Sequence, residues 1–318
     1  MLEQILFKKN LNGKMKIYKN LIINKKHQNS VIAIGNFDGL HLGHQKVINQ
    51  AKKKAKRKKL PFGIISFEPI PAMFFDKRFK NHRINSFSQK KSQLKKLKLD
   101  FLIIIRFNNI FSKLSAENFI KKVIFIKTKC KFLYVSKNFK FGFRRQGNIQ
   151  TLKRYSNLYN YKTIITEPLR KKTKVISSTI IRRKISQGKI HEVNKLLNRN
   201  WCIEGKVIKG DKRGRKIGFP TCNVKILDYV IPKLGVYAVS VKNSKFHRKG
   251  IANIGYRPTF NGQNLLLEVN IFGINKNLYN KEIKVSFIKF IRAEKKFKDL
   301  GQLKRQIKAD IIQTKKNV

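Results

Sequence analysis

The order in which strand-like and helix-like segments alternate constrains this chain more than any other feature. Up to about residue 185, short apolar runs such as 31–34 and 101–105 alternate with segments of helical periodicity. This order predicts βαβ units, in which helices connect parallel strands. Beyond Trp201 the pattern changes to short strands separated by Gly and Pro, which favours a small antiparallel barrel.

The sequence therefore predicts two domains, and 318 residues are enough for both. Residues 1–184 are expected to form an α/β domain of Rossmann-like type with a parallel sheet. Residues 185–318 are expected to form a small antiparallel β-barrel that ends in a helix near 300–312. Hydrophobic residues make up 41% of the chain, so each domain has enough apolar material for a packed core.

The chain is strongly basic, because 74 Lys and Arg face only 16 Asp and Glu, giving a formal net charge of +58. Such an excess raises the alternative of a basic nucleic-acid-binding protein. The lysines, however, are spread over the whole chain, and no nucleic-acid-binding motif accompanies them. Lys, Asn, Ile and Phe share A/T-rich codons, so a biased base composition accounts for the charge. We therefore expect no specific nucleic-acid partner and keep nucleic-acid binding as the alternative.

Neither a membrane span nor an export signal is predicted. The apolar run at 101–105 is far shorter than the roughly 20 residues that a spanning helix needs. The N-terminal segment has an acid at Glu3 and no small-residue cleavage site. The cysteines are too scattered for a metal site or a disulfide framework, which is typical of a reducing cytoplasm. They are Cys130, Cys202 and Cys222.

The segment 35–44, GNFDGLHLGH, lies where a predicted strand ends and a helix begins. Its glycines let the main chain approach a ligand, and the first turn of the helix presents free N–H groups to an anion. His41 and His44 are three residues apart, so one helical turn can direct both imidazoles at one phosphate. The pattern favours a phosphate site over two ordinary surface histidines.

This segment resembles the HxGH signature of nucleotidyltransferases, and more closely the adenylyltransferase half of bacterial bifunctional riboflavin kinase/FAD synthetases. Residues 176–182, ISSTIIR, resemble the ISSTxIR motif of the same superfamily, and their hydroxyls can cap a helix and bind phosphate. The resemblance implies catalytic roles for His41, His44 and Arg182. It also implies ATP and phosphate binding by the other motif residues, which are Gly35, Phe37, Asp38, Gly39, Gly43, Ser178 and Thr179.

A third segment, 135–142, looks like the flavin-side loop of that family. The resemblance implies flavin binding by Asn138, Phe139 and Phe141, whose rings can stack on an isoalloxazine; core packing is the alternative for both phenylalanines. Serine and lysine at 136–137 stand where the family usually has glycine and an acid. This departure leaves a second possibility open, a riboflavin kinase with a weakened adenylyltransferase half.

The second half has its own phosphate-binding pattern, GKVIKGDKRGRKIGFPTCN at 205–223. It resembles the riboflavin kinase motif, in which a glycine-rich flap precedes a G-F-P-T-x-N turn. Thr221 and Asn223 are two residues apart, so on an extended segment they face the same side. Their side-chain oxygens are hard ligands that suit Mg²⁺. The resemblance implies ATP binding by Thr221 and the flap glycines, which are Gly210, Gly214 and Gly218.

Glu268 lies among apolar residues in the run LLLEVN, which calls for a reason in a chain with few acids. The resemblance makes it the base that takes the proton from the ribityl 5′-hydroxyl; the alternative is a solvated Glu beside lysines. The similarity of residues 291–297 assigns Arg292 to the flavin. The family's reactions are phosphorylation of riboflavin to FMN by ATP and adenylyl transfer from ATP to FMN, giving FAD and pyrophosphate. The implied metal is Mg²⁺, and the implied partners are small molecules only: ATP, riboflavin and FMN.

Overall fold

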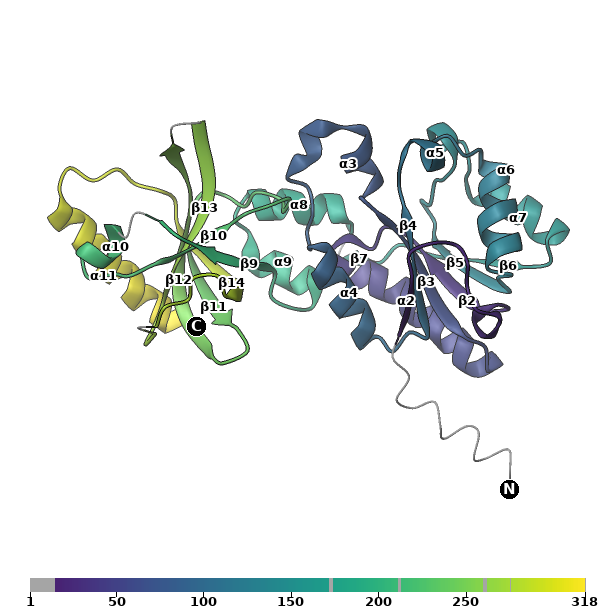
Figure 1. Ribbon diagram of the computed structural model, residues 1–318, viewed down its shortest axis with the longest axis horizontal. Helices are drawn as coiled ribbons and strands as arrows, with labels where there is room; N and C mark the ends of the chain where they lie inside the picture. The colour runs from purple at the N-terminus through teal and green to yellow at the C-terminus, as the bar shows by residue number, and fades with distance from the viewer. Residues whose placement is uncertain (1–14, 172–173, 211–212, 260–261, 275, 318) are drawn as a thin grey trace, which may run out of the picture. The chain divides into compact units, whose positions relative to one another are not determined.

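The computed structural model describes residues 15–171, 174–210, 213–259, 262–274 and 276–317 (Figure 1). Residues 1–14, which include Glu3, lie outside the described part. The chain forms two compact units. Within the described residues, unit 1 comprises 15–79 and 87–176, and unit 2 comprises 80–86 and 177–317.

Unit 1 is built on a six-stranded sheet in which every neighbouring pair of strands is parallel. Parallel strands need long crossover connections, and helices supply most of them here. The strands, in spatial order, are β1 (Lys16–Tyr18), β4 (Phe101–Arg106), β3 (Phe62–Glu68), β2 (Val31–Ile34), β5 (Phe132–Ser136) and β6 (Lys162–Thr166).

Both faces of this sheet are covered, because its central strands are apolar on both sides. All four residues of β2 are buried, and they alternate between two separate apolar clusters. Helix α2 (Leu42–Lys58) packs on one face through Ile48 and Ala51. A π-helix (Ile120–Lys127) packs on the other through Val123. The predicted α/β fold is confirmed.

The remaining elements of unit 1 are short. The sequence predicts one regular helix over 115–126, but the structure has a single α-turn followed by the π-helix. Ser115, a residue type favoured at helix starts, caps this segment, because its hydroxyl accepts a hydrogen bond from the Asn118 N–H at 3.1 Å. The short elements are α3 (Pro71–Phe75), α4 (Phe87–Lys96), α5 (Asn109–Ser112), α6 (Ala116–Phe119), α7 (Ile149–Leu158), β7 (Arg170–Lys171) and β8 (Lys174–Val175).

Unit 2 is a closed barrel of six antiparallel strands, as predicted. The rings of Trp201, Tyr237 and Phe287 pack together inside it, with Trp201 and Phe287 centred 4.8 Å apart. The strands, in barrel order, are β10 (Cys222–Lys225), β13 (Gly262–Ile271), β12 (His247–Thr259), β11 (Gly235–Lys242), β14 (Glu282–Arg292) and β9 (Cys202–Ile208). The helices are α8 (Ser178–Ser186), α9 (Ile190–Leu197), α10 (Arg213–Lys216) and the C-terminal α11 (Leu300–Asn317).

A segment from the first half of the sequence completes unit 2. Residues 80–86, which we name the strap, leave unit 1 after Phe79 and return to it at Phe87. The strap is held by main-chain bonds to the residues before β11 and by the Trp201 indole N–H, which donates to the Ile84 carbonyl at 2.8 Å. Among the described residues, no helix is both long and apolar enough to cross a membrane.

Candidate active sites

The loop that follows β2 carries the HxGH residues and is tightly folded. Phe37, Gly39 and Leu40 all have positive φ angles, of 49°, 79° and 44°. Such angles are costly for residues other than glycine, so the surroundings must hold the loop in place. Asp38 is buried with it. The loop therefore has one fixed shape at the carboxyl end of β2.

The two histidines form a stacked pair at the start of α2. Their ring centroids are 3.7 Å apart, and the rings are inclined by 21°. His41 is 4% exposed and caps the helix, because its Nδ1 accepts a hydrogen bond from the His44 N–H at 3.3 Å. A Cβ on Gly43 would lie 3.1 Å from the His41 ring, so any larger residue there would push the imidazole slightly out of place. The pair stands at a helix N-terminus, where anions are favoured.

The position of this loop in the sheet fits a ligand site. The chain passes from β2 to β3, its neighbour on one side, whereas the neighbour of β2 on the other side is β5. Ligands of open α/β sheets bind beyond the carboxyl ends of the strands where the order reverses in this way. The sheet therefore presents the histidine loop at its usual ligand-binding edge.

The same edge carries an aromatic cluster that the sequence analysis missed. Phe107, which follows β4, lies with its ring centroid 5.3 Å from that of Phe74 and 5.6 Å from that of Phe75. It also contacts Phe67 at the end of β3 and Phe111 on α5. Phe75 is 67% exposed. These phenylalanines are scattered in the sequence, so no motif marks them.

The predicted flavin-side residues differ in accessibility. Asn138 is exposed, and Phe139 is partly buried. Phe141 is 7% exposed and packs against Phe119 in the core, with ring centroids 5.1 Å apart. Its location fits the core-packing alternative, whereas Phe139 stacks on Phe141 from the outer side.

The ISSTxIR segment begins beside the histidine loop and continues in unit 2. The Ile176 carbonyl, still in unit 1, would lie 3.3 Å from a Cβ on Gly43. Ser177 caps α8, and Ser178 and Thr179 form its first turn. The Arg182 Nε donates to the carbonyl of His82 in the strap at 2.7 Å, which fixes the direction of this guanidinium within unit 2.

Unit 2 contains a cavity of about 890 Å³. It collects predicted residues from three separate stretches of sequence, namely 210–223, β13 and β14. Gly218 is the predicted flap residue not found in the lining; it has a φ of +87°, a conformation that favours glycine. The predicted residues that line the cavity are Gly210, Gly214, Thr221, Asn223, Glu268 and Arg292.

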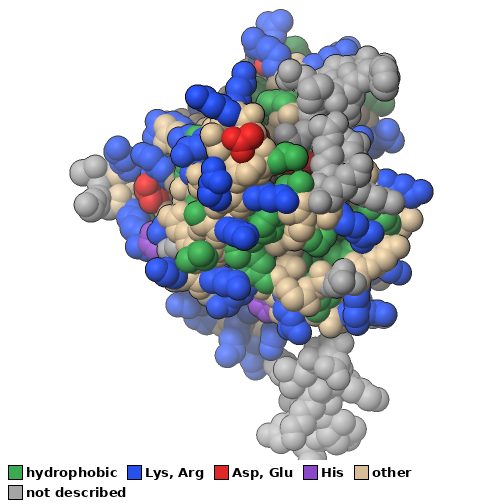
Figure 2. All heavy atoms as spheres, turned by 90° about the vertical axis from the view of Figure 1, so that its left-hand side faces the viewer, with side chains coloured by type: hydrophobic (Ala, Val, Ile, Leu, Met, Phe, Trp, Pro, Cys, Tyr) green, Lys and Arg blue, Asp and Glu red, His purple; other side chains and the backbone are tan. Residues whose placement is uncertain are grey.

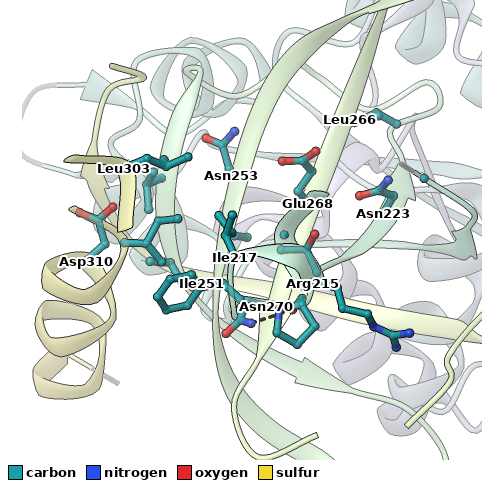
Figure 3. A pocket seen from close by; sticks show the side chains of 18 of the residues that line it. Arg215, Ile217, Asn223, Ile251, Asn253, Leu266, Glu268, Asn270, Leu303 and Asp310 are labelled. Carbon is teal, nitrogen blue, oxygen red and sulfur yellow. Dashed lines mark hydrogen bonds between the residues drawn. The ribbon is translucent and has the colours of Figure 1, made fainter. Parts of the chain in front are cut away.

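A row of three polar side chains crosses the cavity wall. Glu268 on β13 is paired in register with Asn223 on β10 and with Asn253 on β12. Directly opposite residues of antiparallel strands have Cβ atoms about 5 Å apart. Figure 3 shows the polar ends of these three side chains directed the same way from adjacent strands. Leu267 and Val269, on the other face of β13, are buried, so alternation along the strand explains the carboxylate among apolar residues.

Glycines in the predicted flap let the main chain of the flap approach the row formed by Asn223, Glu268 and Asn253. A Cβ on Gly210 would lie 1.9 Å from the Asn223 Nδ2, so the amide rests directly on the Gly210 main chain. A Cβ on Gly214 would lie 2.4 Å from the Phe219 carbonyl oxygen. Although the sequence predicts only a flexible loop here, the structure has a short helix, α10, within it.

The other end of the cavity is closed by α11. Leu303 and Ile307 from this helix line the cavity. Asp310, which is labelled on the helix in Figure 3, anchors it to β14 through Arg292. The Arg292 Nε donates to both Asp310 carboxylate oxygens at 3.0 and 2.9 Å, and its Nη2 donates to Oδ2 at 2.7 Å. Arg292 is therefore a cavity residue whose guanidinium is already held by a carboxylate. No motif in the sequence marks Asp310 as a cavity residue.

The donors in the cavity fit a hard cation that is bound mostly through a substrate. Thr221 and Asn223, whose side chains carry oxygen atoms, both line the cavity. Within the described ranges, no three His, Cys, Asp or Glu side chains gather into a metal site. Outside the cavity, Lys and Arg side chains are scattered over the face seen in Figure 2 and do not form a single stripe.

Together, the paired imidazoles on a parallel sheet and the carboxylate in a barrel cavity define a transferase with two separate sites. The family model of FAD synthetase matches residues 23–180, and that of riboflavin kinase matches residues 197–318. The chain belongs to the family of bifunctional riboflavin kinase/FMN adenylyltransferases, which confirms the resemblance seen in the sequence.

Relatives match along nearly their whole length. The bifunctional riboflavin kinase/FMN adenylyltransferase of Buchnera aphidicola subsp. Schizaphis graminum is 40% identical over 92% of this chain and 96% of its own. That of Bacillus subtilis is 37% identical over 91% and 92%. A crystal structure described as a macrolide-efflux protein from Streptococcus pneumoniae has a TM-score of 0.85 at 30% identity, covering 95% of this chain and 98% of that one.

Proposed function

We propose that unit 2 phosphorylates riboflavin to FMN and that the HxGH site then transfers AMP from ATP to FMN, giving FAD and pyrophosphate. The observation that carries the proposal is the barrel cavity, which gathers Thr221, Asn223 and Glu268 around one space. Family membership and the stacked histidines support the second reaction. We assign residues 1–184 to adenylyl transfer and 185–318 to phosphorylation, although residues 177–184 pack in unit 2.

In the proposed kinase reaction, the 5′-hydroxyl oxygen of riboflavin attacks the γ-phosphorus of ATP. The bond from this phosphorus to its bridging oxygen breaks, ADP leaves, and the hydroxyl proton passes to Glu268. Asn223 and Asn253 flank this carboxylate on the neighbouring strands. The oxygens of Thr221 and Asn223 would hold Mg²⁺, which when bound neutralises phosphate charge. Gly210 and Gly214 let the flap close over the nucleotide.

The apolar end of the cavity suits the flavin ring. Leu303 and Ile307 from α11 offer apolar surface there, and Arg292 lies beside them. The guanidinium of Arg292 is held by Asp310 and by the Ala293 carbonyl, to which its Nη1 donates at 2.9 Å, so its direction in the cavity wall is fixed. We assign Arg292 to flavin binding in this fixed orientation.

In the proposed adenylyl transfer, a phosphate oxygen of FMN attacks the α-phosphorus of ATP. The bond from the α-phosphorus to the oxygen bridging to the β-phosphorus breaks, and pyrophosphate leaves. His41 and His44 donate hydrogen bonds to phosphate oxygens and stabilise the charge that develops on them, so no covalent enzyme intermediate is needed. Ser178, Thr179 and Arg182 are assigned to ATP on the family resemblance.

The FMN ring is proposed to lie against aromatic surface at the carboxyl edge of the sheet. Phe139 and the Phe75–Phe107 contact offer rings for stacking, whereas Phe141 serves the core. Lys137, which departs from the family pattern, pairs with Glu167, with Nζ and Oε1 3.2 Å apart. Its charge is thus partly balanced by this exposed ion pair.

The proposal is tested by incubating the purified chain with riboflavin, ATP and Mg²⁺ and separating the flavins by chromatography. FMN should appear first and FAD after it. A second incubation with FMN in place of riboflavin tests adenylyl transfer alone. If riboflavin yields FMN but added FMN yields no FAD, the weakened-adenylyltransferase alternative holds; if neither product forms with folded protein, the proposal is wrong. We place both reactions in the cytoplasm, because the three cysteines are free thiols.

A further inference from the structure

One lysine is buried directly under the histidine loop. Lys90 lies on α4 and is 3% exposed. Its Nζ donates to the Asn36 carbonyl at 3.4 Å, the Ser66 hydroxyl at 3.3 Å and the Phe67 carbonyl at 3.3 Å. The Glu68 carboxylate lies 3.7 Å from the same nitrogen. Buried lysines are rare and need such partners, so this ammonium occupies a built site.

The partners of Lys90 belong to two structures that meet at the ligand-binding edge. Asn36 is in the loop after β2 and directly precedes Phe37, which has a left-handed backbone conformation. Ser66, Phe67 and Glu68 form the end of β3. The Ser66 hydroxyl also donates to the Asn36 carbonyl, at 3.2 Å, so this one oxygen accepts from both side chains.

We propose that Lys90 is a positioning residue for adenylyl transfer: by fixing the Asn36 carbonyl and the end of β3, it holds the loop at 37–41 in the shape that receives the triphosphate of ATP. This inference rests on the proposed function of the histidine loop. The loop contains two non-glycine residues with positive φ, a conformation that persists only when neighbours hold it. In this role the ammonium acts through the loop, because its hydrogen bonds go to Asn36, Ser66 and Phe67. Because Glu68 offsets its charge, the role is geometric.

The test measures FAD formation from FMN and the KM for ATP in that reaction. Lys90→Met should raise the KM for ATP about tenfold or more and leave the KM for FMN within about twofold. Ser66→Ala removes one of the two donors to the Asn36 carbonyl and should raise the KM for ATP by about threefold. Lys90→Arg keeps the charge and donors, so its effect should be smaller than that of Lys90→Met. The exposed Lys95→Met on the same helix is the matched control and should change nothing.

These readouts separate positioning from stability. A merely destabilised variant has fewer folded molecules, which lowers the apparent kcat and leaves the KM for ATP unchanged. Such a result for both Lys90→Met and Ser66→Ala overturns the inference. If Lys90→Met does not fold, Ser66→Ala decides alone. If the unaltered chain makes no FAD from FMN, the proposed function fails. If the unaltered chain makes FAD but Lys90→Met and Ser66→Ala leave the KM for ATP unchanged, only the inference about Lys90 fails.

Discussion

The ion pair between Arg292 and Asp310 joins the C-terminal helix to the barrel, and its removal should damage both stability and riboflavin binding. Asp310 is 3% exposed and Arg292 17% exposed, and three charge-assisted hydrogen bonds connect them. Removing one partner of a buried pair leaves an uncompensated charge and costs about 3–5 kcal/mol. Because Arg292 keeps some contact with solvent, we expect about 3 kcal/mol for Asp310→Ala.

The assay combines urea unfolding with flavin kinetics. Asp310→Ala should lower the free energy of unfolding of unit 2 by that amount and raise the KM for riboflavin, since Leu303 and Ile307 on the same helix line the cavity. FAD formation from added FMN should persist. The double variant Arg292→Met/Asp310→Leu removes both charges and should recover most of the stability but not riboflavin binding. An Asp310→Ala protein as stable as the original chain refutes this reasoning.

Two further predictions concern the glycine-rich flap and the G-F-P-T-x-N turn at 205–223. Gly210→Ala should slow FMN formation at least tenfold with little change in unfolding free energy, because the added Cβ displaces only the end of the Asn223 side chain. Unchanged kinetics would contradict this expectation. Burial raises the pKa of the Cys222 thiol to about 12, so below that pH the folded protein keeps it protonated. Iodoacetamide at pH 8 should therefore label Cys222 roughly a thousandfold more slowly in folded than in urea-unfolded protein by mass spectrometry, and equal rates disprove its burial.

Local signals in the sequence predicted the architecture well. The β-branched run of β2 and the apolar run of β4 are strong strand formers, and burial on both faces follows from the absence of polar alternation. Ser115 marks a helix start because capping depends only on nearby residues. The π-helix that follows was not predicted, because its register is set by packing against the sheet.

The motif residues of the barrel were predicted, but their partners were not. Glu268 and Asn223 stood out as polar residues in fixed contexts, whereas Asn253 and Asp310 join the cavity only through strand register and helix docking. Lys90 could not be distinguished from the other lysines of a very basic chain. Burial is a tertiary property, and local sequence does not report it. The strap was missed for the same reason, since its bonds reach more than 90 residues along the chain.

We propose that one chain holds two independent catalytic sites, one built on His41 and the other on Glu268. This is tested most directly by comparing FMN formation from riboflavin with FAD formation from added FMN in Glu268→Gln and His41→Ala. Glu268→Gln should lose at least about a hundredfold in the first rate and keep the second, and His41→Ala should do the reverse. Variants that lose both rates together, while still folded, contradict it.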